Sequence, residues 1–138
     1  MAQQQLLLIT LVVIVLGLAV AVAIGMFGDS AVDANRDAVS SDLLNFASRA
    51  HEFYRRPTLF NGGGGSFVKM TSDAQGLARI TNLPGGRNDN GSYSVQSAGT
   101  GTQVVLQGVG IEQTSDGNYV TVRMLVREGS SDSVYSVY

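Results

Sequence analysis

A run of 22 residues without a charged side chain, residues 6–27, constrains this chain more than any other feature. The next residues are Gly28 and Asp29, and Asp29 is the first ionisable side chain. At about 1.5 Å per residue, a helix of this length measures roughly 33 Å, which is enough to cross a hydrocarbon core of about 30 Å. The run therefore predicts a helix that needs lipid or other apolar helices around it.

Two simpler explanations of the run account for less of the sequence. A secretory signal peptide begins with Lys or Arg and has an apolar region of about 7–15 residues. No Lys or Arg precedes Leu6, and the apolar run is longer. A single-span membrane anchor fits the length, but it does not explain the small residues within the run.

Those small residues recur at a helical spacing. Gly17, Ala21 and Gly25 are four residues apart, so they lie on one face of a helix. Small residues in such a row let helix backbones approach closely inside a membrane, where lipid gives no hydrophobic drive for association. We therefore predict that this helix packs against copies of itself. The residues predicted to make this packing are Leu6, Leu7, Leu11, Ile14, Gly17, Ala21 and Gly25.

The helical pattern continues beyond the apolar run, but it becomes one-sided. Val32, Val39, Phe46 and Phe53 recur every seven residues, with Leu43 and Ala50 between them, while Arg36 interrupts the seam once. Pro57 ends the pattern, because the residue before a proline avoids the α region. We predict one extended helix over residues 1–56, with an apolar half (1–28) and an amphipathic half (29–56).

The remaining residues, 57–138, have the composition of a small β-rich head. Residues 61–66 (NGGGGS) predict a flexible turn, and residues 84–91 (PGGRNDNG) predict further turns. Four runs after them alternate as strands do, and they predict an antiparallel meander of three or four strands with one apolar face. The helix residues predicted to cover that face are Val39, Leu43, Phe46, Ala50 and Phe53. The predicted fold class is α+β.

Composition argues against several classes of function. The net charge is −2 with no basic run, so no nucleic-acid contact is expected, and the chain has no cysteine. The single histidine, His51, has no second histidine or acidic cluster at metal-ligand spacing, so we expect a solvated or interface residue. No catalytic motif is present, and we expect no enzyme activity, metal or cofactor. Residues 90–92 (NGS) match the glycosylation triplet but also fit an ordinary turn.

The apolar opening, the continuous helix behind it and the β-rich end together resemble a mature type IV pilin. This resemblance implies that Met1 is the first residue after removal of a leader and that its amine is methylated. Most pilins carry a Glu near this end, whereas this chain has Gln5, which offers a polar core contact without a countercharge. The disulfide of many pilins and the family's helix-loosening proline are also missing, which suggests a divergent branch.

The resemblance implies a structural subunit that polymerises with copies of itself. Before assembly the subunit would lie in the cytoplasmic (inner) membrane, and pilus assembly machinery would then build it into an extracellular filament on the cell surface. Two other interpretations stay open. One is a pseudopilin of a secretion system, although a calcium site of clustered Asp is not evident in the sequence. The other is a single-span anchored binding module, which would favour a flexible juxtamembrane linker over a continuous helix.

Overall fold

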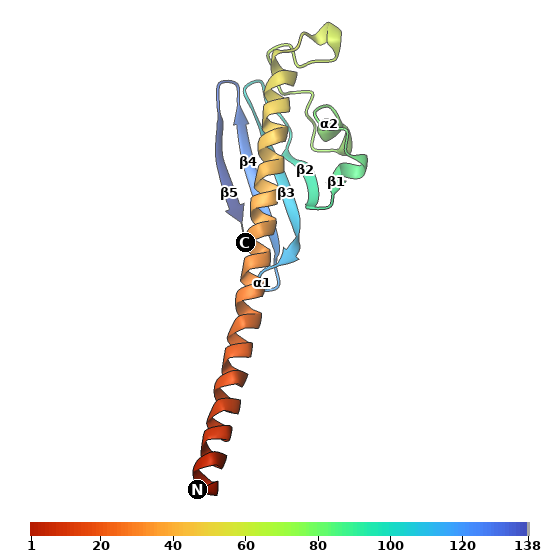
Figure 1. The fold of residues 1–138 in the computed structure, drawn as a ribbon. Helices are drawn as coiled ribbons and strands as arrows, with labels where there is room; N and C mark the ends of the chain where they lie inside the picture. The colour runs from red at the N-terminus through yellow and green to blue at the C-terminus, as the bar shows by residue number, and fades with distance from the viewer. Residues whose placement is uncertain (138) are drawn as a thin grey trace. The chain divides into compact units, whose positions relative to one another are not determined.

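The computed structural model describes residues 1–137, with the side chains of residues 1–130. It divides into two compact units, Met1–Ala31 and Val32–Tyr138. The first unit is helical from Ala2 onward, and the second, here called the head, holds all the strands. Helix α1, Ala2–Arg55, contributes residues to both units (Figure 1).

The glycine-rich turn, residues 61–66, caps the C-terminal end of α1. The amides of residues 63–65 donate hydrogen bonds to the carbonyls of Phe53, Arg56 and Tyr54 at 2.7–2.9 Å. The last carbonyls of a helix have no partner within the helix, and these bonds satisfy them. The turn predicted to be flexible is thus a hydrogen-bonded helix cap, and the short helix η1, Thr58–Phe60, forms part of it.

The strands form one antiparallel sheet, in agreement with the predicted α+β class. Its order is β1-β2-β3-β4-β5, so each strand pairs with its neighbours in sequence. The sequence predicts the four longer strands, but β1 falls in a segment predicted as a turn. Its two residues pair with the start of β2. The bounds are β1 Arg87–Asn88, β2 Gly91–Ser97, β3 Gln103–Gln113, β4 Tyr119–Arg127 and β5 Ser131–Val137.

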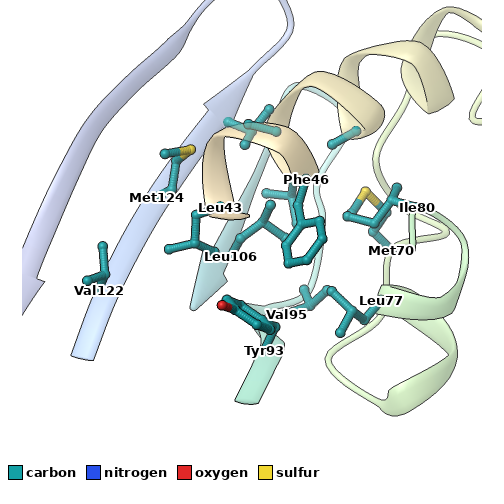
Figure 2. Close-up of a cluster of buried hydrophobic side chains, with 14 of the residues drawn as sticks. Leu43, Phe46, Met70, Leu77, Ile80, Tyr93, Val95, Leu106, Val122 and Met124 are labelled. Carbon is teal, nitrogen blue, oxygen red and sulfur yellow. The ribbon is translucent and has the colours of Figure 1, made fainter. Parts of the chain in front are cut away.

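A single apolar core joins the sheet to the part of α1 that lies in the head (Figure 2). Phe46 meets Tyr93 of β2 edge to face, with ring centroids 5.0 Å apart.

Helix α2, Ala74–Ala78, contributes Leu77 to the same core. The Asp73 side chain caps the N-terminus of this helix by accepting a hydrogen bond from the Gly76 amide at 3.0 Å. Burying each large apolar side chain contributes about 1.5–3 kcal/mol. The short helix η2, Pro84–Gly86, precedes β1.

Two glycines in β3 allow the helix to approach the sheet closely. A Cβ atom at Gly108 would lie 2.6 Å from Cγ1 of Val39, and one at Gly110 would lie 2.0 Å from Oδ1 of Asn35. Both distances are shorter than van der Waals contact allows. The glycines therefore fix where α1 crosses the strand.

Candidate assembly surface

The most unusual surface of the molecule is the apolar half of α1. The large side chains of residues 6–27 are exposed by 45% at Val12 up to 76% at Phe27. The helix is long and apolar enough to cross a membrane, and none of its most apolar window is buried among the described residues. Leu6, Leu7, Leu11 and Ile14, which the sequence predicts to pack against other helices, are exposed in the single chain. This surface is far larger than soluble monomers tolerate.

The small residues of this half leave a shallow, open face. A Cβ atom at Gly17 or Gly25 would meet no atom within 4 Å, apart from the helix's own backbone, and Ala21 is exposed. The one side-chain hydroxyl of residues 1–28, that of Thr10, donates to the Leu7 carbonyl at 2.9 Å. The segment thus presents apolar side chains with its backbone groups bonded inside the helix, as an apolar surrounding requires.

The N-terminal residues are also exposed. The backbone amide of Gln5 donates to the Met1 carbonyl at 3.4 Å in the first turn of α1. Gln5 is exposed in the single chain.

In the head, α1 buries one stripe of side chains. Val39, Leu43, Phe46, Ala50 and Phe53, predicted to pack on the sheet, all belong to the core cluster and are at most 7% exposed. Two further residues of the stripe, Asn35 and Ala47, are buried but did not enter the prediction.

Asn35 ties the helix to the turn between β1 and β2 and to strand β3. Its Nδ2 donates to the Asn90 carbonyl at 2.9 Å, and its Oδ1 accepts from the amides of Ile111 and Glu112 at 3.1 and 3.3 Å. A buried polar side chain is tolerated only when its groups are paired in this way. The sequence offered one signal that Asn35 is buried: it lies four residues before Val39 and therefore on the same face of the helix.

Asp42 is a second polar residue of α1 that bonds to side chains of β1, β2 and the turn between them. Its Oδ2 accepts hydrogen bonds from Asn88 and Asn90 at 2.8 Å and from the Tyr93 hydroxyl at 2.6 Å. Burial is the largest influence and raises the pKa of Asp42, but the bonds from Tyr93, Asn90 and Asn88 outweigh it, so the pKa lies below its ordinary value. Burial, and then the neighbouring carboxylate, raises the pKa of Tyr93.

Two other candidates from the sequence are His51, considered as a metal ligand, and Asn90, considered as a glycosylation site. Among the described residues, no group of three or more His, Asp or Glu side chains is placed to hold a metal ion. His51 is half-buried on α1. The Asn90 side chain, where a glycan would be attached, is half-buried, and its amide already donates to Asp42.

Comparison of the chain with protein-family models, with curated proteins and with solved structures finds no match. The architecture itself, a long apolar N-terminal helix followed by a small antiparallel sheet, is consistent with a pilin-like fold. The helix also provides a segment capable of anchoring the chain in a membrane.

Proposed function

We propose that this protein is the structural subunit of a type IV pilus-like helical filament, built by packing of the N-terminal helices. The observation that carries the proposal is the apolar surface of residues 6–27, which is exposed in the single chain and includes an open small-residue face. Apolar area of this extent must be removed from water, and a membrane or a bundle of identical helices does so.

The proposed mechanism moves the same helix between two apolar surroundings. Before assembly, residues 6–27 lie in the lipid of the inner membrane. Assembly machinery then transfers the helix into a bundle of sister helices. The apolar surface stays out of water in both states, so assembly gains little hydrophobic free energy and depends on close packing. Gly17, Ala21 and Gly25 allow that close approach.

The polymer is expected to be open-ended. Contacts between two different faces of identical subunits repeat without closing when the rotation between neighbours does not form a ring, and they then generate a helix. The heads become the outer shell of the fibre on the cell surface. Gln5 offers its amide group as a polar contact within the core of the bundle.

The test compares Gly17→Leu with Gly17→Ala in cells that assemble the filament. A Cβ atom at position 17 meets no atom within 4 Å outside the backbone of its own helix, so we expect both variants to insert and fold. We expect the leucine to prevent close helix packing and abolish filaments, and the alanine to preserve them. The measurement is electron microscopy of material sheared from cells, with membrane fractionation to confirm insertion.

Abundant normal filaments from Gly17→Leu would argue against packing at this face. A wild-type chain that stays a membrane-inserted monomer would overturn the proposal and favour an anchored binding module. Short fibres seen only when a secretion system is overproduced would favour a pseudopilin.

A further inference from the structure

Two apolar features lie at opposite ends of the head. At one end, the Tyr54 hydroxyl donates to Oε2 of Glu128 at 3.0 Å, and at the other the Asn35 side chain accepts from the Ile111 amide. Residues 35 and 54 belong to one helix, so these two points are separated by about 29 Å along its axis. One feature begins five residues after Tyr54, and the other includes Ile111.

The first feature is the apolar tip, Leu59 and Phe60. Their side chains are 93% and 72% exposed, although the turn that carries them is held in place. Within it, the Phe60 amide donates to the Pro57 carbonyl at 3.0 Å and the Asn61 amide to the Thr58 carbonyl at 3.2 Å. The glycine cap described above fixes the same turn to the end of α1. Two large apolar side chains are therefore presented to water by an ordered turn.

The second feature is a hollow of about 530 Å³ formed where β1, β2 and β3 meet the start of β4. Apolar atoms come from Val109, Ile111 and Tyr119, of which the last two are 58% and 51% exposed. Arg87 and Ser92 supply polar groups at its margin. The hollow is large enough to receive the aromatic side chain of a neighbouring molecule.

The charges near the two features have opposite signs. Exposed Arg49 and Arg55 lie close to the tip in sequence, and Lys69 is fixed beside it because its Nζ donates to the Gly62 carbonyl at 3.1 Å. The acidic residues of that end are engaged: Glu52 pairs with Arg56 at 2.5 Å, and Glu128 accepts from Tyr54.

The segments that flank the lining residues of the hollow in sequence carry three acidic side chains. Asp89 follows β1, Glu112 lies near the end of β3, and Asp116 occupies the turn between β3 and β4. The one charged residue that lines the hollow itself is Arg87, so the acidic charge belongs to the flanking segments. Complementary charge of this kind selects and orients a partner.

We propose that the hollow is the docking site for the apolar tip of a second copy of this chain, so that heads join head to tail. The tip and hollow of one molecule are too far apart to meet, so each is satisfied only by a neighbour. A contact between two different patches of the same chain is heterologous and propagates into a fibre. The inference rests on the proposed filament function and names the contact between its heads.

Cross-linking tests the contact directly, because the chain contains no cysteine. The double variant Phe60→Cys/Ile111→Cys should give a ladder of dimers, trimers and longer species when its filaments are treated with a short bifunctional maleimide. Filaments made from a mixture of the two single variants should give dimers and nothing longer. A control pair, Gln96→Cys/Ile111→Cys, places one thiol on an exposed residue of β2 and should give no ladder.

A second measurement needs no substitution. Hydroxyl-radical oxidation of Phe60 and Tyr119 should fall several-fold between detergent-solubilised monomers and filaments of the unaltered chain. Raising the salt concentration should weaken the contact and slow cross-linking, because exposed charges are screened.

The outcomes separate this inference from the function on which it rests. Normal filaments with no ladder, or with Phe60 oxidised as fast as in the monomer, would overturn the head-to-tail contact and leave the filament proposal standing. Dimers formed by either single variant alone, as readily as by the mixture, would also overturn it. A wild-type chain that forms no filament would overturn both.

Discussion

Helix α1 contains two stretches of similar length with opposite surroundings. In residues 6–27 apolar side chains occur on every face and are exposed, whereas in residues 32–53 they form one stripe that is buried in the head. Both stretches are regular helix, so backbone geometry does not distinguish them. The distribution of side chains around the axis decides whether a helix is completed by its own chain or needs an outside partner.

The largest effect expected from this contrast is on folding of the head. Leu43→Ala should lower the free energy of unfolding by about 2–5 kcal/mol, because it leaves a cavity in the core. Leu11→Ala, the same substitution at a side chain that is 60% exposed, should leave it unchanged. Urea unfolding of the full chain in detergent micelles, followed by near-ultraviolet circular dichroism, measures both. Equal losses from the two variants would mean that residues 6–27 also support the head.

A smaller effect is expected from the polar anchor of the buried stretch. Asn35→Leu removes the partners of the Asn90 carbonyl and of two β3 amides, and should cost about 1–3 kcal/mol. Asn45→Leu is the matched control, because Asn45 is exposed and bonds only to the Ser41 carbonyl in its own helix. The same urea experiment applies. If Asn35→Leu is neutral, apolar contacts alone hold the helix on the sheet.

The smallest effect is expected on the stability of the head at low pH, through Asp42. The folded pKa of Asp42 is below the unfolded value of 3.8, so its stabilising contribution is complete above that value and is lost as the pH falls through the folded pKa. Asp42→Asn should therefore show a shallower loss of stability below pH 3.8 than the wild type. Asp37→Asn makes the same charge change at an exposed position of the helix and serves as the control. Identical acid unfolding curves for wild type and Asp42→Asn would contradict the role of this carboxylate.

Local pattern was enough to predict the elements that make the fold. The seven-residue recurrence from Val32 to Phe53 and the alternation in β4 depend only on residues close in sequence. The structure confirms an α+β fold, with Val120, Val122, Met124 and Val126 buried on one face of the sheet. The exposed apolar surface of residues 6–27 also follows from local sequence, because nearly every residue in this run is apolar in any fold.

Polar contacts between distant residues escaped prediction. Asn35 lies beside the predicted seam and shows no role until Ile111 is brought next to it. Asp42 resembles an ordinary surface acid until Asn88 and Tyr93 surround it. The partners are 46 or more residues apart in sequence in each of these pairs. No spacing rule connects them, because their proximity is created by strand pairing.

The amino-acid sequence by itself determined the apolar helix, the stripe that follows it and the alternation of the strands, since each is a repeat written along consecutive residues. Tertiary structure alone decided which polar groups pair with the helix, why β3 needs glycines at 108 and 110, and that Leu59 and Phe60 stay exposed at one end of the head while a hollow forms at the other. These features depend on which surfaces the folded sheet brings together and which it leaves uncovered.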